Sequence, residues 1–82
     1  MTKEQPSAVE ALQSATLKIQ LNGQLRELPR PCSVADLLLS LQTGSAPVAV
    51  ERNEQVVPKA RHADTLLVEG DQVEVVTLVG GG

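Results

Sequence analysis

The chain has 82 residues and a formal net charge of −3, and it contains no Phe, Trp or Tyr. This length fits one small domain, and the 24 Leu, Ile and Val residues are enough for a thin core. The lack of aromatic side chains argues against base stacking with single-stranded nucleic acid, and an acidic chain without a basic cluster argues against binding a phosphate backbone. No apolar stretch approaches the ~18 residues of a membrane span, and the N-terminus has no apolar signal-peptide segment. We therefore expect a cytoplasmic protein without nucleic-acid or membrane partners.

Residues 1–15 mix Gln, Glu, Ser and Ala around a proline, with few large apolar side chains. A short isolated helix of this kind is marginal in water. We expect a flexible leader at residues 1–15, a folded domain at residues 16–79, and a flexible glycine tail at residues 80–82.

The segment 16–21 alternates apolar and polar side chains, which is the pattern of a half-buried strand. Asn22-Gly23 is a strong hairpin signal because both residues tolerate positive φ, and residues 24–28 return as a second strand. A two-residue turn would leave Leu25 on the polar face. We therefore predict a three-residue loop with a bulge at Gly23, which places Leu25 inside.

Ser33 is predicted to cap a helix, with Asp36 at the reciprocal position of a capping box. Gly44 is the expected left-handed residue that ends the helix. Its apolar stripe for packing on the sheet consists of Val34, Leu37, Leu38 and Leu41.

The second half of the chain contains further strand patterns. In order, we expect a strand at 47–52 with Val48 and Val50 on one side, a turn at 53–54, an irregular segment at 56–65, a short apolar strand at 66–68, a turn at 70–71 and a last strand. Val73, Val75, Thr77 and Val79 share one face of that last strand. Val76 and Leu78 share the other, and apolar residues on both faces predict a central position.

Strands that pack one helix on one face give an α+β domain. With the last strand central and beside the first, these two strands run parallel. We predict a β-grasp fold, in which a mixed sheet of four to five strands packs on one main helix.

Conventional catalytic or metal-binding groups are scarce. A single cysteine and a single histidine cannot supply a tetrahedral zinc site, so no metal site is expected. His62 is expected at the surface, and Cys32 is expected half-buried before the helix, where a helix N-terminus can lower a thiol pKa. The acidic residues are dispersed and the domain looks too small for a sizeable pocket. An autonomous enzyme is therefore not expected.

The C-terminal run of Gly80, Gly81 and Gly82 is the most distinctive feature. Three glycines after an apolar strand end side-chain packing and leave a slender tip, which extends roughly 10 Å when fully stretched. The tip carries an α-carboxylate, and without side chains beside it this group can enter a narrow channel of a partner enzyme. A frayed terminus is the alternative reading of the glycines alone.

The chain resembles the ThiS family of ubiquitin-like sulfur carriers over residues 17–82. The segments that carry this resemblance are IQLNG at 19–23, VADLL at 34–38, VAVERN at 48–53, VPK at 57–59, EGDQVEVV at 69–76 and LVGGG at 78–82.

This resemblance implies a role in thiamine biosynthesis. It implies that an E1-like adenylyltransferase (ThiF) adenylates the Gly82 carboxylate with ATP and Mg, and that sulfur drawn from cysteine by a desulfurase converts it to a thiocarboxylate. A thiazole synthase (ThiG) then takes the sulfur. Gly80, Gly81, Val79 and Leu78 are the implied partner-binding tail, the chain itself binds no cofactor, and it is a protein cosubstrate rather than an enzyme.

Three other functions remain open from the sequence. The small subunit of molybdopterin synthase resembles this chain in fold and in its Gly-Gly end, and a ubiquitin-like modifier or interaction module would use the same fold without sulfur. The third is a regulatory β-grasp domain of the fusion type, whose tail is inert. The apolar residues expected to contact a partner are Val76 and Leu78, although packing against residues 56–68 is an equal expectation for them.

Overall fold

The computed structural model describes residues 15–44 and 46–78. In chain order, its elements are β1 (Thr16–Leu21), β2 (Gln24–Pro29), α2 (Val34–Ser40), β3 (Val48–Arg52), β4 (Gln55–Val56), a turn of 3₁₀ helix (Lys59–Arg61) and β5 (Gln72–Thr77). The predicted leader, apart from its last residue, lies outside the described residues, as do Val79, Gly80, Gly81 and Gly82. Their assignments stay predictions.

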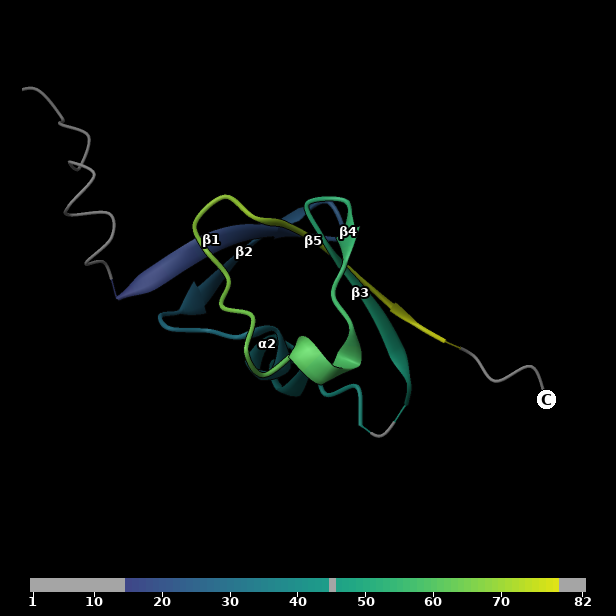
Figure 1. Cartoon of the computed structure of the whole chain (residues 1–82). Coiled ribbons are helices and arrows are strands. Elements are labelled where there is room, and N and C mark those ends of the chain that lie inside the picture. Colours follow the sequence, from purple (N-terminus) through teal and green to yellow (C-terminus); the bar gives the residue numbers. More distant parts are fainter. Residues whose placement is uncertain (1–14, 45, 79–82) are drawn as a thin grey trace, which may run out of the picture.

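The strands form one sheet in the order β2-β1-β5-β3-β4, with α2 against one face (Figure 1). β1 and β5 run parallel, and the β1–β2, β3–β5 and β3–β4 pairs are antiparallel. β5 therefore lies at the centre of the sheet, as its two apolar faces predicted. This mixed five-stranded sheet with one helix confirms the predicted α+β, β-grasp arrangement.

The first hairpin differs from the prediction. Leu21 pairs with Gln24, so that Asn22 and Gly23 alone form the turn, with φ angles of 51° and 83°. Leu25 lies opposite Gln20 and is 67% exposed, so the predicted bulge is wrong. Two residues with positive φ match the twist of the flanking strands, and this turn geometry outweighs the burial of one leucine.

The helix begins as predicted. The Ser33 hydroxyl accepts from Asp36 N at 3.0 Å, and the Asp36 carboxylate accepts from Ser33 N at 3.1 Å, which completes the capping box. Val34 and Leu37 are fully buried, and Leu38 and Leu41 pack at the edge of the core. The predicted apolar stripe is therefore confirmed.

The helix ends earlier than predicted. Its last residue is Ser40 and its C-cap is Leu41, and the left-handed residue that follows is Gln42, with φ 57°. Gly44 also has positive φ, but two residues further on. In the described part of the chain, no helix is long and apolar enough to cross a membrane.

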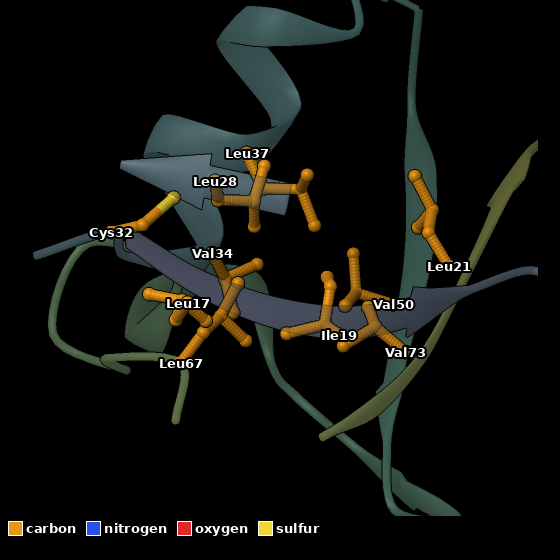
Figure 2. Packing of buried hydrophobic residues seen from close by; sticks show 10 residues of the cluster. All are labelled: Leu17, Ile19, Leu21, Leu28, Cys32, Val34, Leu37, Val50, Leu67 and Val73. Carbon is orange, nitrogen blue, oxygen red and sulfur yellow. The ribbon is translucent and has the colours of Figure 1, made fainter. Parts of the chain in front are cut away.

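The core lies between α2 and the covered face of the sheet (Figure 2). Its members are Leu17, Ile19, Leu21, Leu28, Cys32, Val34, Leu37, Val50, Leu67 and Val73. On the sheet side, most members of this cluster are the alternating residues of β1 and the buried residue of the central strand β5. The core thus fixes β5, the strand that leads to the C-terminus, against β1 and β3.

The connection between β3 and β5 also differs from the prediction. The predicted strand at 66–68 is limited to a single bridge between Ser33 and Leu66, and the short strand of the sheet is instead β4. Leu67 is nevertheless buried, and its N–H donates to the Cys32 carbonyl at 2.9 Å. A single buried apolar residue holds this segment against the core. One residue and one bridge do not make a strand.

Candidate functional site

The C-terminal end of β5 is exposed. Val76 and Leu78 are 55% and 50% exposed, so the expectation that they are accessible to a partner is favoured over packing against residues 56–68. Leu78 N donates to the Pro47 carbonyl at 2.8 Å, which extends the β3–β5 pairing to the last described residue. The chain is therefore held to the sheet until four residues before its C-terminal carboxylate.

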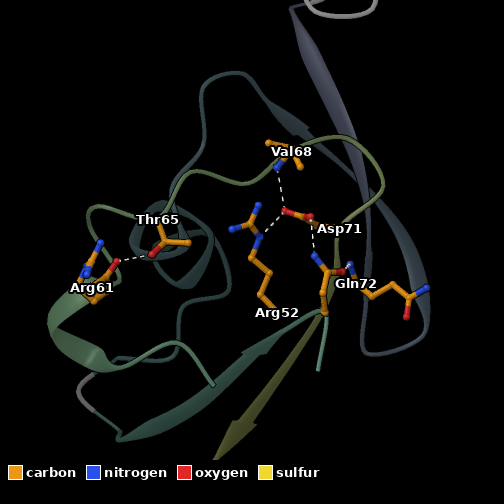
Figure 3. A network of polar contacts seen from close by, with 7 residues as sticks. Arg52, Arg61, Thr65, Val68, Asp71 and Gln72 are labelled. Atoms are coloured by element: carbon orange, nitrogen blue, oxygen red, sulfur yellow. Dashed lines mark hydrogen bonds and ion pairs between the residues drawn. The ribbon is translucent and has the colours of Figure 1, made fainter. Parts of the chain in front are cut away.

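The beginning of β5 is fixed by the buried carboxylate of Asp71 (Figure 3). One oxygen accepts from Arg52 Nε at 2.8 Å and from Val68 N at 2.9 Å, and the other accepts from Asn53 Nδ2 at 3.0 Å. These partners come from the end of β3, the β3–β4 turn and the segment before β5. Asp71 therefore joins three segments at the start of the last strand.

The Asn53 side chain extends this network to β5 itself. Its Oδ1 accepts from Gln72 N at 2.9 Å, and Asn53 N donates to the Gln72 carbonyl at 2.7 Å. The sequence indicated only turns at 53–54 and 70–71. The contacts between them join residues far apart in the chain, and no local pattern reveals such pairs.

The middle of β5 is held by Asn22. Its Oδ1 accepts from Val75 N at 2.9 Å, and its Nδ2 donates to the Val75 carbonyl at 3.2 Å. Asn22 N also donates to the Val73 carbonyl at 2.9 Å. β1 ends one residue earlier, so the Asn22 amide occupies the position that a further peptide group of β1 would take. Asn22 thus has two functions, the hairpin turn and the support of β5.

The face of the sheet opposite α2 carries two glutamates next to the exposed apolar residues. Glu51 and Glu74 are directly opposite each other on β3 and β5, and Ala49 and Val76 form the next pair on the same face toward the end of β5. Like charges directly opposite destabilise a sheet slightly. An acidic and apolar surface therefore lies beside the strand that leads to the tail.

His62 and Cys32 are both buried, in contrast to the predictions. His62 Nε2 lies 3.0 Å from the Val57 carbonyl, and the His62 carbonyl accepts from Ala35 N at 3.0 Å. Burial, followed by the nearby Asp36 carboxylate, raises the pKa of the Cys32 thiol. Both side chains therefore serve the packing of the domain, and the sequence gave no sign of the long-range contacts that bury them.

The expectation that the domain lacks a sizeable pocket is also wrong. An open groove of about 770 Å³ lies between α2, residues 42–44 and 46–48, and the 3₁₀ turn with His62. Its walls are mostly aliphatic, with Leu38, Leu39 and Val48 among them, and Lys59 and His62 are its charged or titratable side chains among the described residues. This set offers no pair of groups for acid–base or nucleophilic catalysis.

The model of the ThiS family matches residues 19–82. The chain is 37% identical over 65 residues to the sulfur carrier protein ThiS of Bacillus subtilis (strain 168), covering 78% of this chain and 98% of that protein. It is also 29% identical to the crystal structure of a thiamine biosynthesis protein (ThiS) from Geobacter metallireducens, with a TM-score of 0.69. That match covers 80% of this chain and 100% of the other.

A third relative is a longer protein. The chain is 39% identical over 66 residues to a thiazole synthase of Paramagnetospirillum magneticum, and the match covers 80% of this chain. The chain spans about a fifth of the length of the thiazole synthases that it matches, 20% in each of two.

Proposed function

Because the chain belongs to the ThiS family, we propose that it is a sulfur carrier whose C-terminal carboxylate becomes a thiocarboxylate and donates sulfur for thiazole formation in thiamine biosynthesis. The reactive group is the carboxylate of Gly82. The observation that carries the proposal is the family match, which begins within β1 at residue 19 and extends through Gly80, Gly81 and Gly82.

The chemistry needs two steps, both performed in partner enzymes. In the first, a carboxylate oxygen attacks the α-phosphorus of ATP, pyrophosphate leaves, and an acyl-adenylate forms. In the second, hydrosulfide, which a thiol releases from the persulfide of the desulfurase with formation of a disulfide, attacks the acyl carbon; the bond to AMP breaks, AMP leaves, and the thiocarboxylate forms. A carboxylate resists direct attack because a nucleophile would add negative charge to an anion. The adenylate removes that charge and provides a leaving group.

The partners follow from these steps. An E1-like adenylyltransferase supplies the site for ATP and Mg, a cysteine desulfurase supplies sulfur, and a thiazole synthase consumes the thiocarboxylate. The carrier holds neither nucleotide nor metal and is a cosubstrate. The relatives named as thiazole synthases and as ThiS support the thiamine pathway, and no observation favours the molybdopterin alternative.

The role of the described residues is to hold the strand that carries the tail and to present it to the partner enzymes. Asp71 fixes the start of β5 and Asn22 fixes its middle, so the strand reaches the edge of the domain in a defined direction. Val76 and Leu78 are exposed there, and the acidic pair on the same face lies nearby. We assign this surface and the tail residues Val79, Gly80 and Gly81 to partner recognition.

The proposal is tested by ATP–pyrophosphate exchange with the adenylyltransferase of the same organism. The wild-type chain should support exchange, whereas deletion of Gly82 or the substitution Gly81→Leu should abolish it. Neither change affects a core residue, so unfolding followed by circular dichroism should be unaltered. Exchange that persists without Gly82 would contradict the proposed reactive group.

A second measurement separates the alternatives. The thiocarboxylate form should bind the thiazole synthase, and not the large subunit of molybdopterin synthase, in a pull-down with both purified proteins. Formation of an isopeptide bond to a lysine, with no sulfur incorporated, would instead support a ubiquitin-like modifier.

A further inference from the structure

The two sides of β5 are paired differently along its length. On the β3 side, hydrogen-bonded pairs alternate with non-hydrogen-bonded pairs, as in any antiparallel ladder. The bond from Leu78 N to the Pro47 carbonyl marks one hydrogen-bonded pair, so the neighbouring pair, Val48 with Thr77, is a non-hydrogen-bonded one. The bond from Asn53 N to the Gln72 carbonyl places the same alternation at the other end of β5.

This alternation turns the N–H and C=O of Thr77 away from β3, toward the side of the sheet where β1 lies. β1 pairs with β5 only at Gln72 and Val73, and the Asn22 amide satisfies Val75. No hydrogen bond from residues 15–44 or 46–78 reaches the N–H or C=O of Thr77. The central strand therefore becomes an open edge at Thr77, immediately beyond Asn22.

A hollow of about 310 Å³ lies beside this edge. Leu21, Leu41 and Val75 provide apolar wall, and Gln24 and Arg26 of the first hairpin provide the polar part. The position therefore offers a partner strand the unpaired N–H and C=O of Thr77 and a hollow for one of its side chains.

We propose that this edge receives an extended segment of the adenylating enzyme, whose backbone pairs with the N–H and C=O of Thr77. The inference rests on the proposed function, because it concerns the partner that activates Gly82. Five residues follow Thr77 in the sequence, so a partner segment paired there contacts the carrier only five residues before the carboxylate that the enzyme activates. An aliphatic side chain of that segment enters the hollow.

The edge is tested first by a proline. Thr77→Pro removes the free N–H but leaves the bonds to β3, which residues 76 and 78 make. The matched control is Val56→Pro on the edge strand β4, which removes a different outward N–H of the same sheet. Val57 N donates to the Val50 carbonyl, so the Val56 N–H faces away from β3. Both variants should keep the circular dichroism spectrum of the wild type.

In the pyrophosphate exchange assay, Thr77→Pro should raise the KM for the carrier about tenfold, the effect of losing one backbone hydrogen bond and disturbing its neighbour. Val56→Pro should leave KM at the wild-type value. An unchanged KM in Thr77→Pro, with an active wild type, would overturn the inference alone. A wild-type chain that supports no exchange overturns the proposed function, and the inference with it.

Amide hydrogen exchange on the wild-type protein gives an answer that does not depend on the folding of a variant. In the free chain, the Thr77 amide should exchange rapidly and the Leu78 amide, bonded to Pro47, slowly. Addition of the adenylating enzyme should slow the exchange of Thr77. If the Thr77 amide stays unprotected in the complex, this assignment of the edge is contradicted. It is also contradicted if the Thr77 amide becomes protected in the free chain at higher concentration, because the edge would then bind a second copy of the chain.

Discussion

Leu37 is the side chain whose truncation tests the packing of α2 most directly. It is 0% exposed and points from the helix into the centre of the core (Figure 2). Leu37→Ala removes three carbon atoms, and at about 0.8 kcal/mol for each buried methylene-sized group the loss is roughly 2.4 kcal/mol. The cavity left behind adds to this, so we expect a total loss of roughly 2.5–5 kcal/mol. A chain of this length has only about 4–12 kcal/mol of stability.

The matched control lies two residues along the same helix. Leu39 is 77% exposed, and Leu39→Ala should change the free energy of unfolding by less than about 0.5 kcal/mol. The two variants share the chemical change and the helix, and they differ in burial. The difference between their free energies of unfolding therefore measures what the burial of Leu37 in the core contributes to stability.

Urea unfolding followed by far-ultraviolet circular dichroism is the appropriate assay, because the chain has no aromatic residue for fluorescence. The midpoint for Leu37→Ala should fall well below those of the wild type and Leu39→Ala. If the two alanine variants unfold at the same urea concentration, the assignment of the buried helix face is wrong.

Three further changes test other parts of the structure by the same assay. Asp71→Ala removes the acceptor of the partly exposed Arg52 guanidinium and of two N–H donors, so it should cost roughly 1–3 kcal/mol, and a loss below about 0.5 kcal/mol would contradict the central role of the Asp71 network. Leu25→Gln should cost less than about 0.5 kcal/mol because Leu25 is exposed, and a larger loss would favour the bulged register. The raised pKa of Cys32 means that the folded state holds the thiol proton more tightly, so this stability is complete below the unfolded pKa and is lost as the pH rises through the folded pKa. The wild type should therefore lose more stability at alkaline pH than Cys32→Ala, and parallel profiles would argue against this effect.

The sequence predicted the parts of the fold that depend on local pattern. The alternation of β1, the capping box of Ser33 and Asp36, and the apolar faces of β5 each specify an element within a few residues. The central position of β5 followed from the same reasoning, since a strand with apolar residues on both faces has to be covered by neighbours.

The failures involve contacts between distant residues or competition between local preferences. Burial favours Leu25 inside, whereas the geometry of the two-residue turn places it outside. The partner of His62, the Val57 carbonyl, lies in an irregular segment that no sequence pattern marks. The Asp71 and Asn22 side chains bond mainly to residues far away in the chain, which local patterns do not reveal. In the candidate site, the exposure of Val76 and Leu78 is established, whereas the roles of Gly80, Gly81 and Gly82 rest on the family.

The most direct test of the sulfur carrier is the intact mass of the chain after incubation with the adenylyltransferase, ATP, Mg, cysteine and a cysteine desulfurase. The account predicts that one oxygen is replaced by one sulfur, that fragmentation places the change at Gly82, and that the change disappears without ATP. An unaltered mass, under conditions in which the same enzymes convert the Bacillus subtilis relative, would contradict it.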